Sequence, residues 1–214
     1  MARTRTSKAW MMQHVNDPYV KRASAEGMRS RAAYKLQQIN EKDKLIKPGM
    51  LVVDLGATPG GWSQVAGRIV APAGRVIAID LLEMAPLAGV TFIRGDFSEA
   101  EGLAALEQEL AGAPADLVLS DMAPNISGIA LADQSRLMGL VELALDFSIK
   151  HLKPQGNFLV KVFHGAGFDG YVNAMRSVFK QVQTRKPDAS RKGSREVYVL
   201  GKGLKMAEHN SETH

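Results

Sequence analysis

The stretch that decides the fold reads Leu51-Val-Val-Asp54-Leu-Gly56-Ala-Thr-Pro-Gly60-Gly-Trp62, and a helical pattern over residues 63–70 follows it. A short apolar run ending near an acid, then clustered glycines, then a helical pattern predict a strand, a tight loop and a helix. Glycine lacks a Cβ atom, so such a loop can turn sharply and leave room for a ligand against its main-chain N–H groups. The stretch therefore predicts a ligand-binding turn at the end of a buried strand.

A second apolar run, Arg75-Val-Ile-Ala-Ile-Asp80, also ends in an acid. In a doubly wound sheet this position presents a carboxylate to a ribose diol. The glycine spacing of the first loop differs from the dinucleotide pattern G-x-G-x-x-G, and no Gly-Lys-Ser/Thr triplet of a nucleoside triphosphate loop follows. We therefore expect an adenosine ligand without phosphates, such as S-adenosylmethionine, with Asp80 on its ribose. The alternative is a glycine-rich turn that only packs.

Strands and helices alternate along the rest of the chain. Strands are expected at residues 51–54, 75–80, 90–94, 116–120, 156–162, 181–185 and 196–201. Helices are expected at residues 28–39, 62–70, 99–110, 131–151 and 168–180. This order predicts an α/β, Rossmann-like fold with a seven-stranded, mostly parallel sheet and helices on both faces. No helix separates the last two strands, so one strand should run antiparallel.

Length and composition bound the organisation of the chain. Its 214 residues, 45% of them hydrophobic, suffice for one sizeable core. We expect one domain over residues 28–204, after a basic segment at 1–27 that packs on or extends from it, and before a disordered tail at 205–214. The absence of cysteine excludes disulfides and cysteine-based zinc sites. Without a long apolar run or a secretory leader, the expectation is a cytoplasmic protein that does not bind membranes.

The positive charge is concentrated in two places. The formal net charge is +5, and residues 1–31 carry seven Arg or Lys against two acids, so the remainder is balanced. A second basic cluster lies within residues 185–195. Basic patches on an otherwise balanced body suit a polyanion such as RNA, and Trp10, His14 and Tyr19 among the N-terminal charges could stack on bases. The alternative is a basic tail that only favours solubility.

Polar residues follow the predicted strands where ligands of such sheets gather. They are Asp80, Asp96 in an Arg-Gly-Asp-Phe run, and Asp121 in an Asp-Met-Ala-Pro-Asn run. Lys161 lies within the apolar strand 156–162, where an amine is costly to desolvate unless an acid neutralises it or it takes part in chemistry. The neighbouring Asp121 is the expected partner, and a structural ion pair or a catalytic pair would each explain the lysine.

Several motifs together resemble the FtsJ family of ribose 2'-O-methyltransferases, most closely its bacterial heat-shock branch that modifies 23S ribosomal RNA. The motifs are residues 54–62, 121–125, 161–163 (Lys-Val-Phe), 194–196 (Ser-Arg-Glu) and 29–36 (Arg-Ser-Arg-Ala-Ala-Tyr-Lys-Leu). The likeness runs from about residue 7 to residue 202. It implies the fold of an S-adenosylmethionine-dependent methyltransferase.

The resemblance also implies roles for individual residues. The residues implied in catalysis are Lys35, Asp121, Lys161 and Glu196. The residues implied in binding S-adenosylmethionine are Gly60, Trp62, Asp80, Asp96 and Asp121. The implied substrate is a uridine 2'-hydroxyl in the A-loop of 23S RNA within the large subunit, with RNA contacts through Arg29, Arg31, Lys35 and the basic segment. No metal is expected, because the sulfonium is already an excellent leaving group, and we expect a monomer.

Other functions fit parts of the pattern. A methyltransferase of transfer RNA would keep every motif, and a noncatalytic RNA-binding assembly factor would need only the basic patches. A nicotinamide-dependent oxidoreductase would share the fold and Asp80. An enzyme of messenger caps is disfavoured, because this length leaves no room for an additional guanine-binding domain. Lys161 could act as general base or as a steering cation for the ribose oxygen.

Overall fold

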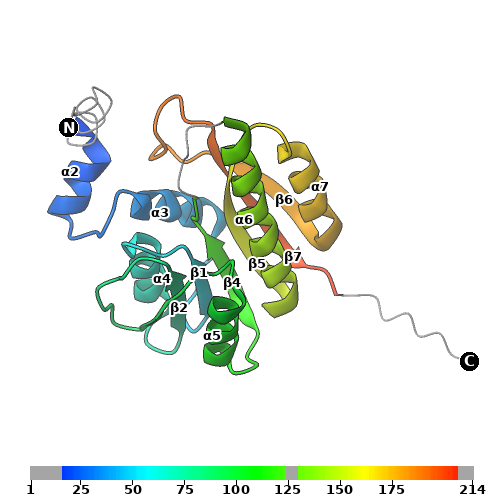
Figure 1. Ribbon diagram of the computed structural model, residues 1–214. Coiled ribbons are helices and arrows are strands. Elements are labelled where there is room, and N and C mark those ends of the chain that lie inside the picture. The colour runs from blue at the N-terminus through cyan, green and yellow to red at the C-terminus, as the bar shows by residue number, and fades with distance from the viewer. Residues whose placement is uncertain (1–15, 124–129, 207–214) are drawn as a thin grey trace, which may run out of the picture.

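The computed structural model describes residues 16–123 and 130–206 (Figure 1). Its strands are β1 Leu51–Leu55, β2 Arg75–Asp80, β3 Val90–Arg94, β4 Ala115–Ser120, β5 Leu152–Phe163, β6 Phe179–Arg185 and β7 Glu196–Leu204. Its helices are α2 Pro18–Ala25, α3 Ala32–Asp43, α4 Gly61–Val70, α5 Ala100–Leu110, α6 Ala130–His151 and α7 Phe168–Val178. Within these residues, no helix is long and apolar enough to cross a membrane.

All the strands join in one seven-stranded sheet of order β3-β2-β1-β4-β5-β7-β6. Five strands pair in parallel from β3 to β5, whereas β7 pairs antiparallel with both β5 and β6. The expected sheet of seven strands with a single antiparallel member is thereby confirmed. Parallel strands end at the same edge, so the turns after β1, β2, β3 and β4 meet there.

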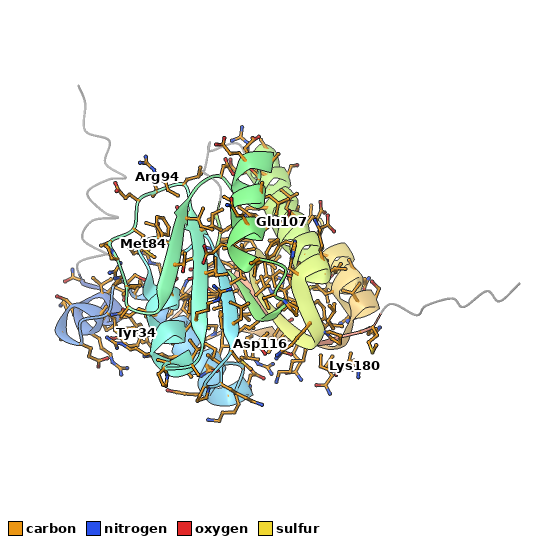
Figure 2. The ribbon with its side chains drawn as sticks, turned by 90° about the horizontal axis from the view of Figure 1, so that it is seen from below. Tyr34, Met84, Arg94, Glu107, Asp116 and Lys180 are labelled. Atoms are coloured by element: carbon orange, nitrogen blue, oxygen red, sulfur yellow. The ribbon has the colours of Figure 1, made fainter. Side chains whose placement is uncertain are left out.

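Helices cover both faces of the sheet. Helices α3 and α4 pack together on one face, and α5, α6 and α7 pack on the other. Figure 2 shows Tyr34 of α3 and Glu107 of α5 on opposite sides of the strands. Helix α2 lies at the end of the molecule beside α3 (Figure 1), where Tyr19 packs against Tyr34 with ring centroids 5.6 Å apart.

The structure explains why residues 51–55, which form β1, are almost all apolar. Val53 and Leu55 belong to the core beneath α5, α6 and α7, whereas Val52 belongs to the core beneath α3 and α4. Successive side chains of a strand point to opposite faces, so both faces of β1 are buried and both demand apolar residues. By the same alternation, Asp54 lies on the face covered by α3 and α4.

The structure departs from the expected elements in two regions. The unpredicted helix α2 begins where the Asp17 side chain accepts a hydrogen bond from Tyr19 N and Pro18 occupies the first turn. Strand β5 begins directly after α6, earlier than expected, because its polar start contains a bulge where Gln155 adopts φ +68°. Trp10 and His14, Pro124 and Asn125, and residues 207–214 of the expected tail lie outside the described residues.

Candidate active site

A cavity of about 680 Å³ opens at the edge of the sheet where β1, β2, β3 and β4 end. Its volume falls within the usual range for small-molecule sites. The lining residues from these strand ends and from α6 include Gly56, Thr58, Asp80, Asp96, Asp121 and Leu140. Glycine at position 56 allows the turn to lie close to the segment after β4, because a Cβ atom there would lie 2.5 Å from Met122 Cγ.

The Asp80 carboxylate is fixed on the wall of this cavity. Its Oδ2 accepts a hydrogen bond from Thr58 N at 2.9 Å, and its Oδ1 accepts one from Leu82 N at 2.8 Å. Each carboxylate oxygen can accept more than one hydrogen bond. Two backbone donors therefore orient the group and leave acceptor capacity toward the cavity, which fits a ribose diol.

Asp96 lies on the same wall, at the turn that follows β3. Its Oδ1 accepts hydrogen bonds from Ser98 N at 2.8 Å and from Ser98 Oγ at 2.6 Å. Both bonds fall on one oxygen and hold the carboxylate beside Phe97, which also lines the cavity. A carboxylate next to an apolar ring fits an adenine, whose amino group would donate to the acid.

Asp121 connects the cavity to a buried amine. Lys161 Nζ lies 3.1 Å from Asp121 Oδ1 and donates a hydrogen bond to the Asp121 carbonyl oxygen at 2.6 Å. The Lys161 residue is only 8% exposed. The Tyr198 hydroxyl donates to the same Asp121 Oδ1 at 3.1 Å. Burial, and then the charges of Asp121 and Glu196, raise the pKa of Tyr198 well above its ordinary value, so the phenol stays a neutral donor.

A second ion pair lies beside the first. Lys35 Nζ of α3 lies 2.7 Å from Glu196 Oε1, and Ser190 Oγ lies 3.1 Å from the same oxygen. Burial opposes ionisation of Glu196, but the charges of Lys35 and Lys161 outweigh it, and its pKa lies below the ordinary value. Lys35 Nζ also lies 5.7 Å from the centroid of the Tyr198 ring. The two ion pairs thus flank one tyrosine.

Comparison with known proteins identifies the family. The model of the FtsJ-like methyltransferase family matches residues 28–204. The chain belongs to this family. It is 60% identical over 205 residues to the ribosomal RNA large subunit methyltransferase E of Azoarcus sp. (strain BH72), covering 96% of this chain and all of that one. The protein of the same name from Methylobacillus flagellatus is 63% identical over 201 residues, covering 94% of this chain and 97% of that one.

Solved structures share the fold of this chain. A ribosomal RNA methyltransferase structure from Plasmodium falciparum superimposes on this methyltransferase with a TM-score of 0.74 and 28% identity, covering 82% of this chain and 98% of that one. An rRNA-methylase structure from Clostridium thermocellum has a TM-score of 0.52 and 16% identity, covering 80% of this chain and 97% of that one, and shares the fold.

The structure brings the expected catalytic residues of the methyltransferase together from four elements: Lys35 from α3, Asp121 after β4, Lys161 from β5 and Glu196 from β7. Asp80, Asp96 and Asp121 share the cavity wall. The roles of these residues stay predictions, because the structure supplies their geometry and not their chemistry.

Gly60 and Trp62 lie outside that wall. The Trp62 indole N–H donates to the Ala32 carbonyl at 2.9 Å, and its ring packs against Tyr198 with centroids 5.5 Å apart. The Trp62 side chain therefore packs beside Tyr198 and the two ion pairs. A cofactor contact of Trp62 would use its backbone N–H in the first turn of α4. Gly60 is the N-cap of that helix with φ +103°, a conformation that favours glycine.

The expected RNA-binding arginines both have protein partners. Arg31 pairs with Asp17 at 2.5 Å and donates to the Ala189 carbonyl, which ties α2 to the loop before β7. Arg29 binds carbonyl groups beside the cavity. Their contact with RNA stays a prediction. In the structure, both side chains join segments of the protein to each other.

Two residues of the site had no assigned role in the sequence. Tyr198 lies two residues after Glu196 on the same strand, so strand alternation places both on one face. Asp54 is fully buried, and its Oδ2 accepts a hydrogen bond of 2.6 Å from Ser63 Oγ. Among the described residues its Oδ1 has no partner. A carboxylate inside the apolar run was visible in the sequence, but its burial was not.

Proposed function

We propose that this methyltransferase transfers the methyl group of S-adenosylmethionine to a uridine 2'-hydroxyl in the A-loop of 23S ribosomal RNA, within the large ribosomal subunit. The names of its relatives specify ribosomal RNA of the large subunit. The uridine, the A-loop and the assembled subunit come from the family resemblance. A cytoplasmic location and a monomeric state belong to the same proposal.

The position of Asp121 is the observation that carries the proposal. This residue lines the cavity that fits the cofactor, and it also pairs with Lys161 at 3.1 Å. The cavity and the buried amine are therefore neighbours, separated by a single side chain. Transfer between two bound groups requires the acceptor oxygen about 3 Å from the methyl carbon and in line with the bond that breaks. A site with the amine elsewhere could not provide this geometry.

The chain's residues would divide the work between them. When bound, S-adenosylmethionine supplies an electrophilic methyl group whose leaving group is a neutral thioether. Lys161 contacts both the carboxylate and the carbonyl of Asp121, and its ammonium has three donors. A neutral Lys161 would take the proton of the ribose hydroxyl as general base, whereas a charged Lys161 would hold the ribose oxygen and stabilise the negative charge that develops on it while the proton passes to water. Tyr198 would orient Asp121, to which its hydroxyl donates, Asp121 and Glu196 would orient Lys161, and Lys35 would lie closer to the RNA.

Replacement of Lys161 tests this assignment. We expect Lys161→Ala to lower the rate of transfer by about 10²- to 10⁴-fold, the usual contribution of a positioned side chain at the reacting group. Its affinity for S-adenosylmethionine, measured by calorimetry, should stay close to that of the wild type. Lys153→Ala is the matched control, because Lys153 lies on the same strand but is exposed and pairs with Asp116. Loss of cofactor affinity in Lys161→Ala would make Lys161 a binding residue instead.

The substrate is tested by offering labelled S-adenosylmethionine with naked 23S RNA, large subunits and transfer RNA in parallel. Methylation of the large subunit at the A-loop is the expected result, and preferential methylation of transfer RNA would contradict it. A noncatalytic assembly factor would retain its function in Lys161→Ala. Binding of NADH in place of S-adenosylmethionine would point to an oxidoreductase.

A further inference from the structure

Residues 27–32 form a short strap across the glycine turn. Gln64 of α4 holds the strap at two points, because its Oε1 accepts from Arg29 N at 2.9 Å and its Nε2 donates to Gly27 O at 2.8 Å. Trp62 holds the far end through the Ala32 carbonyl at 2.9 Å. The strap is therefore fixed to the first turn of the helix that follows the glycines.

The Arg29 side chain extends from this strap to the glycine turn and to the loop that follows β2. Its Nη1 donates to Pro59 O at 3.3 Å and to Ala85 O at 2.6 Å, and its Nη2 donates to Pro86 O at 2.7 Å. Pro59 belongs to the glycine turn, whereas Ala85 and Pro86 belong to the loop that follows β2. A planar guanidinium can bridge several carbonyls in this way, whereas an ammonium is a point donor on a flexible stem.

The loop that Arg29 holds carries the ribose side of the cavity. It begins directly after Asp80, and its residues Leu81 and Leu82 line the cavity. Thr58 Oγ1 of the glycine turn donates to Leu82 O at 2.9 Å, so the loop and the turn are joined at a second point. Met84, labelled in Figure 2, lies on the same loop. A Cβ atom on Gly60 would lie 2.8 Å from Met84 Sδ and 3.0 Å from Arg29 Cδ.

We propose that Arg29 is a positioning residue for the cofactor, which clamps the loop after β2 onto the glycine turn and thereby sets the width of the S-adenosylmethionine site. This inference rests on the proposed function, since it assigns that cofactor to the cavity. It differs from the expected role of Arg29 as an RNA contact. The same strap leads into α3, whose first turn carries Lys35, so the clamp also connects the cofactor wall to the catalytic ion pairs.

Two substitutions at Arg29 test the clamp. We expect Arg29→Ala and Arg29→Lys each to raise the Kd for S-adenosylmethionine about tenfold, because both remove hydrogen bonds from a charged donor. The lysine variant keeps the charge but lacks the planar guanidinium that bridges the three carbonyl groups. Calorimetric titration with S-adenosylmethionine measures the Kd directly. The salt dependence of binding to an A-loop RNA should match the wild type in Arg29→Lys, because phosphate contacts respond to charge.

Lys21→Ala is the matched control. It removes one positive charge from exposed α2, near the strap and away from the cavity, and should leave the cofactor Kd unchanged. Thermal unfolding of each variant confirms that the fold is kept. An unchanged cofactor Kd in both Arg29 variants would overturn the proposal, and weaker RNA binding in Arg29→Ala would then favour the expected RNA contact. Methyl transfer by the wild type tests the proposed function separately, because cofactor affinity alone decides the role of Arg29.

Discussion

A single carboxyl group shows how much local environment matters in this site. Asp54 is fully buried on the sheet face beneath α4, and burial, with the nearby charges of Asp121 and Asp80, raises its pKa to about 7 despite hydrogen bonds from Ser63. An isolated buried charge is costly, so the neutral form is favoured. The site therefore holds an acid whose charge changes near neutral pH, close to the acids that line the cavity.

The raised pKa of Asp54 predicts a dependence of stability on pH. Below about pH 4 both the folded and unfolded chains keep the proton, whereas between about pH 4 and pH 7 only the unfolded chain releases it. Stability should therefore fall as pH rises through this window. Asp54→Asn removes this contribution, so its loss of unfolding free energy from about pH 5 to pH 8 should be smaller by roughly 3 kcal/mol. Urea unfolding at both pH values measures it, and parallel losses would contradict it.

Lys161 and Asp54 show which properties of a single residue can be predicted from the sequence and which cannot. A lysine within an aliphatic strand is conspicuous, and its pairing with Asp121 was predicted and is confirmed at 3.1 Å. Asp54 stood in an equally apolar run, but its raised pKa depends first on its complete burial and then on its neighbours, the Ser63 hydroxyl, which lowers the pKa, and the other acids at this end of the sheet, which raise it. Those neighbours come from the fold, so no local pattern specifies them.

At the scale of elements, α3 connects the ion pair of Lys35 with Glu196 to the outermost strand of the sheet, β6. Its first turn carries Lys35, and its last residue, Asp43, accepts hydrogen bonds from Arg185 of β6 at 2.6 and 2.7 Å and from Lys202 of β7 at 2.8 Å. The hydrogen bond from Arg185, with help from Lys202, lowers the pKa of Asp43 to about 2. Both ends of the helix are thus fixed to β7, the strand that begins with Glu196, and its last residue is also fixed to β6.

Loss of the Asp43 carboxylate should destabilise the protein. Asp43→Asn is expected to lower the unfolding free energy at neutral pH by about 2 kcal/mol, from the pKa difference between 3.8 and about 2. Because the folded pKa is depressed, the contribution is present above about pH 4 and is lost as pH falls toward 2. The variant and wild type should therefore converge in acid. Glu41→Gln on the exposed side of α3 is the control for urea unfolding, and an equal effect there would contradict the assignment.

The elements themselves were predictable where burial is symmetric. Strands β1, β2 and β4 lie close to their expected ranges, because apolar runs between turn residues are unambiguous when both faces are covered, and the partly buried β3 also matches its expected range. The start of β5 was not predicted, because its residues 153–156, Lys-Pro-Gln-Gly, are polar and have the composition of a loop. Helix α2 was hidden because its short, polar sequence depends on the cap at Asp17 and on tertiary contacts such as Arg31.

At the scale of the molecule, the sheet order explains why Asp121, Lys161 and Glu196, which are far apart in the sequence, lie together. Strand β7 inserts antiparallel between β5 and β6, so its beginning lies at the edge where β4 and β5 end. The predicted topology placed Asp121 and Lys161 at one edge, whereas Glu196 joined them only through the family resemblance, because the sheet order that sets β7 beside β5 was not predicted. The topology alone could not show that residues of α6 line the cavity while the ion pairs lie beside α3. Which helix lies against which group depends on the face of the sheet to which each side chain points.

The same edge should carry the RNA, and its exposed charges provide the test. Lys192 and Arg195 are exposed on the loop that leads into Glu196, whereas Arg185 and Lys186 in that basic cluster bind protein groups. Removing a side chain that neutralises one phosphate reduces the slope of log Kd against log salt by about 0.7 to 0.9. Lys192→Gln with Arg195→Gln should therefore lower the slope by roughly 1.5 and leave the affinity for S-adenosylmethionine intact.

Lys180 supplies the control for this experiment. It is exposed at the beginning of β6, at the opposite edge of the sheet (Figure 2), so Lys180→Gln changes the net charge without approaching the ion pairs. Filter binding of an A-loop RNA over a series of salt concentrations gives each slope. A decrease shared equally by the control would mean that RNA responds to overall charge, and an unchanged slope in the double variant would place the RNA elsewhere. A decrease confined to the double variant would locate the substrate beside Glu196, within reach of Lys35 and Lys161.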